Sequence, residues 1–81
     1  MRDIKLGKYR HFKGYDKIYQ VIGTAVHSET LEELVIYKML YDMPDYKAGT
    51  IWVRPKEMFL EKAPVGEKNI TGQEYRFEYI D

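Results

Sequence analysis

The stretch HSETLEELVIYKMLY, from His27 to Tyr41, constrains the fold of this chain most, because it fits two different secondary structures. Thr30 and Glu33 have the spacing of a capping box, which predicts the start of a helix. Residues 34–37, however, read Leu-Val-Ile-Tyr, a β-branched and aromatic run that favours a strand. The choice between them decides whether the protein carries a substantial helix or is nearly all β.

The flanking residues favour the strand. Read as a helix, the apolar stripe that begins at Leu31 is interrupted at Lys38. Read as a strand from Leu34, both faces are largely apolar, so periodicity alone does not decide. The polar segment 28–30 lies between two β-rich segments, as the turn of a hairpin does. We therefore predict a hairpin with residues 19–27, turning near residues 28–33, with at most one helical turn from Thr30.

The rest of the chain also divides into short strands separated by turn residues. Gly23 lies inside the predicted strand 19–27, which indicates a bulge or a close approach of another backbone. Pro55 cannot donate to a β-ladder, so the strand beginning at Thr50 should end there. The further predicted segments are a first strand within 7–14, a loop at 42–49, a helical turn at 56–59, a loop at 64–72 and a last strand at 75–79. This pattern predicts a mainly β protein, a small barrel or roll of about five strands with one short helical turn.

Length and composition restrict the class of protein. The 81 residues suffice for a single domain, with residues 1–6 expected to form a flexible N-terminal lead-in. Eight tyrosines, with three phenylalanines and one tryptophan, supply the large buried area that a small β domain needs. Without cysteine, disulfides and thiolate zinc sites are excluded, and a reducing cytoplasm is the expected location. No apolar run approaches the ~20 residues that span a bilayer, so we expect no membrane partner.

Four strings of the sequence together carry a resemblance to a known family. They are GKYRHFKG, YQVIGTAVHSETLEELVIYKMLY, IWVRPKEMFLE and YRFEYI. Between Gly7 and Ile80 the chain resembles the bacterial and phage family called domain of unknown function 1653. The resemblance implies a small, often stand-alone protein with a Src-homology-3-like β-roll. The family has no established activity, so the resemblance implies no catalytic residue.

The sequence contains no pattern typical of an active site or a metal site. The histidines, His11 and His27, lack further ligands at metal-binding spacing. His27, Ser28 and Glu29 are adjacent in sequence, but a catalytic triad is defined by geometry and not by adjacency. Neither a glycine-rich phosphate loop nor a nucleophile elbow occurs. We therefore expect no metal, no cofactor and no enzymatic activity.

Trp52 and Arg54 are the most informative pair. If Ile51 and Val53 face the core, Trp52 and Arg54 share the opposite face of one strand. A tryptophan beside an arginine is typical of binding hot spots. The alternative is that Trp52 covers an open barrel end and Arg54 stacks on it as a cation–π contact.

The leading hypothesis that follows is a non-enzymatic interaction module. It would present an aromatic and arginine groove to a peptide or protein partner. The candidate groove consists of Trp52 and Arg54, with Tyr37 and His11 as possible neighbours.

A second hypothesis concerns the N-terminal strand. Lys8, Arg10 and Lys13 alternate with Tyr9 and Phe12, and basic groups beside aromatic rings can bind single-stranded nucleic acid. Against this, the formal net charge is zero, whereas nucleic-acid-binding domains usually carry a basic excess. Solvated lysines that protect an edge strand explain the same residues. Nucleic-acid binding is therefore the weaker alternative.

Overall fold

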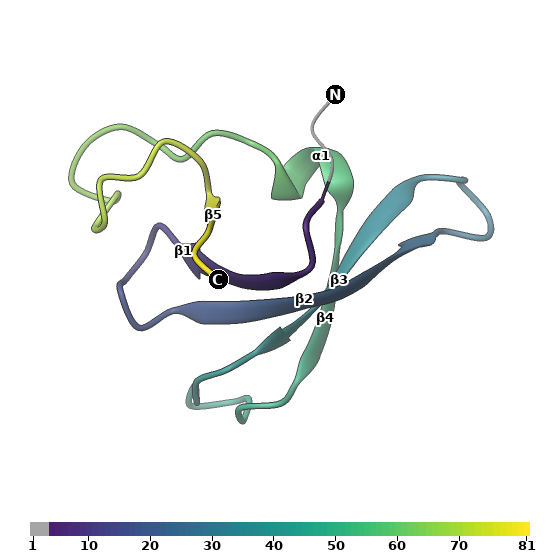
Figure 1. Ribbon diagram of the computed structural model, residues 1–81, viewed down its shortest axis with the longest axis horizontal. Coiled ribbons are helices and arrows are strands. Elements are labelled where there is room, and N and C mark those ends of the chain that lie inside the picture. The colour runs from purple at the N-terminus through teal and green to yellow at the C-terminus, as the bar shows by residue number, and fades with distance from the viewer. Residues whose placement is uncertain (1–3) are drawn as a thin grey trace.

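The protein is one five-stranded antiparallel sheet with one short helix, as the sequence predicts (Figure 1). The computed structural model describes residues 4–81. The sheet order is β4-β3-β2-β1-β5, and every neighbouring pair is antiparallel. In chain order the elements are β1 (Gly7–His11), β2 (Ile18–Val26), β3 (Glu33–Met39), β4 (Ile51–Pro55), α1 (Lys56–Phe59) and β5 (Phe77–Tyr79).

Within the stretch 27–41, which fitted both a helix and a strand, residues Glu33–Met39 form strand β3. β3 pairs with β2 from Val26 opposite Glu33 onwards, so the predicted hairpin is confirmed. The amide of Leu31 donates to the carbonyl of His27, and the hydroxyl of Thr30 accepts from the amide of Glu32. Thr30 thus caps a turn instead of a helix. Leu31 adopts φ 62°, a left-handed conformation that reverses the chain within this short turn.

The predicted irregularity at Gly23 is a β-bulge. The register between β2 and β3 shifts between Val21 and Gly23, so Ile22 is the extra residue of β2. An added Cβ at Gly23 would meet no atom within 4 Å. Gly23 therefore belongs to a bulge, and the space where a Cβ would lie is open.

The core lies on the inner face of a strongly curled sheet. Phe59 of α1 stacks on Phe77 of β5, with ring centroids 4.3 Å apart, and both contact Tyr37 of β3. Tyr9, Val21 and Val35 complete the buried cluster. Edge-to-face and stacked rings supply most of this contact, as the tyrosine-rich composition predicts.

The two edge strands, β4 and β5, approach each other through side chains without forming a ladder. Arg54 of β4 lies 5.2 Å from the ring centroid of Phe77 on β5. The sheet is not closed into a barrel, because β4 pairs only with β3 and β5 only with β1. Of the two predicted forms, barrel or roll, the open form is the one observed.

The side chains of β4 face the opposite way from the arrangement assumed in the sequence analysis. Ile51 and Val53 are more than half exposed, and Trp52 and Arg54 face inward. The reason is the register with β3: Trp52 lies opposite Tyr37 and Arg54 opposite the buried Val35. Paired residues of neighbouring strands project from the same face of a sheet. Trp52 and Arg54 do share a face, but it is the inner one.

Both ends of the described chain attach to this sheet. Ile4 packs on the core cluster, and the hydroxyl of Tyr9 bonds both the carbonyl and the amide of Lys5. The flexible lead-in predicted for residues 1–6 falls partly on residues 1–3, which lie outside the described part. The last strand is shorter than expected, since Tyr75 forms only an isolated bridge with Lys62. Within residues 4–81 no helix is long and apolar enough to cross a membrane.

Candidate functional site

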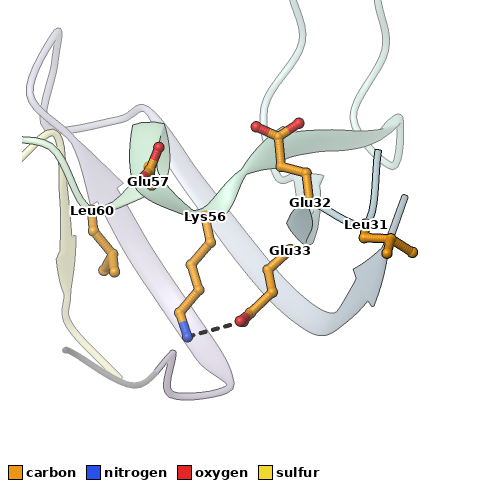
Figure 2. Close-up of a pocket in the computed structure, with 6 residues that line it drawn as sticks. All are labelled: Leu31, Glu32, Glu33, Lys56, Glu57 and Leu60. Carbon is orange, nitrogen blue, oxygen red and sulfur yellow. Dashed lines mark hydrogen bonds and ion pairs between the residues drawn. The ribbon is translucent and has the colours of Figure 1, made fainter. Parts of the chain in front are cut away.

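One surface pocket lies between the β2–β3 turn and α1 and is acidic (Figure 2). It has a volume of about 350 Å³ and is lined by Leu31, Glu32, Glu33, Lys56, Glu57 and Leu60. Lys56 and Glu33 point toward each other across it and form an ion pair of 3.2 Å. Lys56 is therefore already paired with Glu33, and the other two carboxylates of the pocket, Glu32 and Glu57, are exposed to solvent. None of these groups has a geometry that requires a ligand.

A second pocket is basic and aromatic, and it is the candidate site. It has a volume of about 320 Å³ at the end of the sheet where β1 ends, β2 begins and the loop after β3 folds back. The inner face of β4 forms one wall through Arg54. The lining residues are His11, Lys13, Lys17, Tyr19, Tyr41, Asp42, Met43, Pro44 and Arg54.

Arg54 is the half-buried cation of this pocket. Its guanidinium lies over Phe77 and donates a hydrogen bond to the hydroxyl of Tyr37. Its Nη1 is shielded from solvent and has no hydrogen-bond acceptor among residues 4–81. No described carboxylate forms an ion pair with Arg54. A shielded guanidinium nitrogen without an acceptor is costly, because its lost hydration is not replaced.

His11 is a buried imidazole beside three positive charges. The ring is buried, stacks on Phe12 and accepts a hydrogen bond at Nδ1 from the amide of Lys13. Burial, followed by the charges of Lys13, Arg54 and Arg76, lowers the pKa of His11 from 6.5 to about 4. His11 is therefore neutral at physiological pH, and its proton resides on Nε2 because Nδ1 is an acceptor.

Two tyrosines form the polar part of the wall. The hydroxyls of Tyr19 and Tyr41 share a short hydrogen bond, and their rings meet edge to face. Burial, and then the bond to Tyr41, raises the pKa of Tyr19, so its phenol stays protonated. The shared bond uses one of the two phenolic protons and leaves the other available to a ligand. Lys17 lies over the Tyr41 ring, with Nζ 4.7 Å from the centroid.

The two lysines of the pocket have a weak carboxylate partner or none among the described residues. Lys17 Nζ is 3.7 Å from the carboxylate of the exposed Asp16, a long and solvated contact. Lys13 has no ion pair within the described residues. The carboxylate of Asp42 accepts a hydrogen bond from the amide of Ala48 in its own loop. The pocket therefore carries a positive charge that its own acidic residue only partly offsets.

The structure brings together only part of the predicted groove. His11 and Arg54 meet in the pocket, and Tyr37 lies buried behind Arg54. Trp52 is not in the pocket: its indole N–H points to the sulfur of Met39, and its ring contacts Tyr46 edge to face. The alternative stacking of Arg54 on Trp52 is replaced by the contact with Phe77.

The predicted nucleic-acid residues do not share one surface. Lys8 and Arg10 lie on the outer face of β1, opposite to the buried Tyr9. Arg10 is occupied by an ion pair of 2.6 Å with Glu78 and a hydrogen bond to Gln73. Lys13 follows β1 and lines the pocket instead.

Sequence reasoning missed Lys17, Tyr19 and Tyr41. A usable signal was present, because Lys17 and Tyr19 are two residues apart at the start of a strand. Tyr41 likewise continues the alternation of Val35, Tyr37 and Met39. The sequence does not indicate which strands lie side by side at the end of the sheet that holds this pocket.

The second histidine has a local role. Nδ1 of His27 accepts from the amides of Glu29 and Thr30 at the exposed hairpin turn. No group of three or more potential metal-ligating His, Cys, Asp or Glu side chains occurs within residues 4–81.

Comparisons with known proteins place the chain in a family. The model of a protein family of unknown function, DUF1653, matches residues 7–79. The crystal structure of a DUF1653 protein from Bordetella bronchiseptica is 33% identical, with a TM-score of 0.75, and the match covers 96% of this chain and 88% of that chain. A comparison with curated proteins finds no match. A family model that spans nearly the whole chain, and a solved relative with the same fold, lead to one conclusion: this protein belongs to the DUF1653 family of unknown function.

Proposed function

We propose that this protein is a non-enzymatic interaction module whose basic, aromatic pocket receives an acidic group of a peptide or protein partner. The observation that carries the proposal is Arg54, which lines the pocket and forms no ion pair with a described carboxylate. An anionic group of a partner would supply the missing counter-charge to this half-buried guanidinium.

The surroundings of Arg54 support a site for an anion. Lys13 and Lys17 line the same pocket; Lys13 has no ion pair within the described residues, and Lys17 has only a long, solvated contact with Asp16. The neutral His11 adds no negative charge. Met43 and Pro44 provide an apolar wall beside these charges, as ligand pockets commonly have. Strands supply His11, Tyr19 and Arg54, and the adjoining turn and loop supply the other lining residues.

The proposal is tested with two peptides that differ in one charge. A short blocked peptide with a central glutamate is titrated against the ¹⁵N-labelled protein, and the glutamine counterpart serves as control. The glutamate peptide should shift the amide signals of Lys13, Tyr19 and Arg54 and bind more tightly than the glutamine peptide. Equal binding of both peptides would show that the pocket does not recognise the acidic group.

Variants locate the binding to the pocket. Lys13→Ala should weaken the binding of the glutamate peptide by up to about 1 kcal/mol, the range for a solvent-exposed ion pair. Lys8→Ala removes an equally exposed lysine from the outer face of β1 and should leave binding unchanged. Arg54→Lys keeps the positive charge but loses the planar guanidinium, which can donate two parallel hydrogen bonds. Binding should therefore weaken while folding is retained. Thermal melts of all variants separate a loss of binding from a loss of structure.

The same variants discriminate against the nucleic-acid alternative. If the strand from Lys8 to Lys13 bound single-stranded nucleic acid, the affinity would fall steeply with salt, and Lys8→Ala would flatten that slope. The pairing of Arg10 with Glu78 reduces the charge available for such binding. We further infer a cytoplasmic location from the absence of cysteine, and a Src-homology-3-like roll from the strongly curled sheet.

A further inference from the structure

We infer that the acidic group received by the pocket is a doubly charged phosphoryl group on a side chain of the partner, an inference that rests on the proposed function. The pocket places Lys13, Lys17 and Arg54 around one volume, with Asp42 as its acidic lining residue. A carboxylate carries one negative charge, whereas a phosphomonoester carries nearly two at neutral pH.

Charge balance favours the dianion. His11 contributes no charge near neutral pH, so three cations line the pocket against one lining carboxylate, and Asp16, outside the lining, offsets Lys17 only through a solvated contact of 3.7 Å. A phosphoryl dianion offsets more of this positive charge than a carboxylate does. The gain is largest for Arg54, the half-buried cation without an ion pair.

The hydrogen-bond donors lead to the same ligand. Arg54 and the two lysines line the pocket and carry guanidinium and ammonium donors. The hydroxyl pair of Tyr19 and Tyr41 leaves one phenolic proton to donate. A carboxylate has two oxygens to accept from these groups, whereas a phosphoryl group has three.

The size of the pocket indicates a phosphoryl group attached to a side chain instead of free phosphate. Its volume of about 320 Å³ exceeds what a bare oxyanion occupies and lies at the lower end of ligand pockets, roughly 300–1,000 Å³. The Tyr41 ring, Met43 and Pro44 line the remaining space with apolar atoms. These surfaces fit the carbon atoms of the side chain that carries the phosphate.

The experiment extends the peptide pair by a third member, in which phosphoserine replaces the central residue, and by inorganic phosphate. At pH 7.5 the phosphoserine peptide should bind at least about tenfold more tightly than the glutamate peptide, the value of one added charge-assisted hydrogen bond. It should also bind more tightly than inorganic phosphate. At pH 5 the phosphoryl group becomes a monoanion and the preference over glutamate should shrink, because its second pKa is about 6.

Variants complete the test. Lys17→Ala should reduce the preference for phosphoserine over glutamate, and Lys8→Ala should leave it unchanged. Equal or weaker binding of the phosphoserine peptide would overturn this inference while preserving the proposed function. If inorganic phosphate binds as tightly as the phosphoserine peptide, the inference that the phosphoryl group is attached to a side chain is overturned. If neither charged peptide binds more tightly than the glutamine peptide, the proposed function fails as well.

Discussion

His11 illustrates how one buried residue reports the character of its surroundings. It lies between Phe12 and Phe77 on the inner face of β1, and the charges near it come from the turn after β1, from β4 and from the segment before β5. Those charges are Lys13, Arg54 and Arg76, and all three are positive. A protonated imidazole would be both desolvated and repelled here, so the folded protein holds His11 in its neutral form.

This state of His11 predicts a pH dependence of stability. Because burial and the neighbouring cations lower the pKa of His11 to about 4, the unfolded chain binds a proton between pH 6.5 and 4 that the folded protein does not. The contribution of the neutral His11 to the free energy of unfolding is therefore fully present above pH 6.5. It is lost as the pH drops toward 4, by up to roughly 3 kcal/mol. Urea unfolding between pH 7 and 5 measures the slope.

Two variants assign that slope to His11. His11→Gln should remove most of it, whatever its effect on the stability at neutral pH. His27→Gln, which changes the exposed histidine of the hairpin turn, should leave the slope as it is in the wild type. A slope that persists unchanged in His11→Gln would contradict the prediction.

At the scale of elements, the β2–β3 hairpin holds one residue in an unfavourable backbone conformation. Its turn contains Leu31, which has φ 62° and is 74% exposed. A leucine there is strained by its Cβ and buries little surface in return. The turn exists because the backbone must reverse between Val26 and Glu33 for the strands to pair.

Leu31→Asn should therefore stabilise the protein, since asparagine tolerates the left-handed conformation better. The expected gain is about 0.5–1 kcal/mol in the free energy of unfolding, measured by thermal or urea unfolding. Val65→Asn removes a fully exposed apolar side chain elsewhere and should change stability by less than about 0.5 kcal/mol. A loss of stability in Leu31→Asn would mean that its side chain makes a contact that matters.

At the scale of the whole molecule, residues far apart in sequence meet around Gln73. This buried side chain donates to the carbonyls of Arg10 and Tyr75 at 2.8 Å each, and it accepts from the hydroxyl of Thr71. It thereby joins the segment before β5 to β1. Phe77, four residues after Gln73, lies 5.2 Å from the guanidinium of Arg54 on the other edge strand.

Gln73→Leu should consequently be among the more damaging single changes. It removes the amide that donates to the carbonyls of Arg10, Tyr75 and Arg76, and each buried group left unpaired costs about 1–3 kcal/mol. We expect a loss of roughly 2–4 kcal/mol in the free energy of unfolding by urea titration. Gln20→Leu, at a half-buried position on β2, is the control and should be close to neutral. Wild-type stability in Gln73→Leu would show that water replaces the lost bonds.

The sequence by itself determined the strands, the hairpin around residues 28–33, the bulge at Gly23 and the strand end at Pro55. Alternation, turn residues and the missing proline N–H act over a few residues, so they are legible without the fold. It did not determine which face of β4 is inward, because Ile51 and Val53 on one side and Trp52 on the other are both apolar. Only pairing with β3 decided that, and only the curl of the sheet brought Arg54 to His11 and Phe77. Contacts between residues distant in sequence depend on the sum of twist, bulge and packing, which no local pattern specifies.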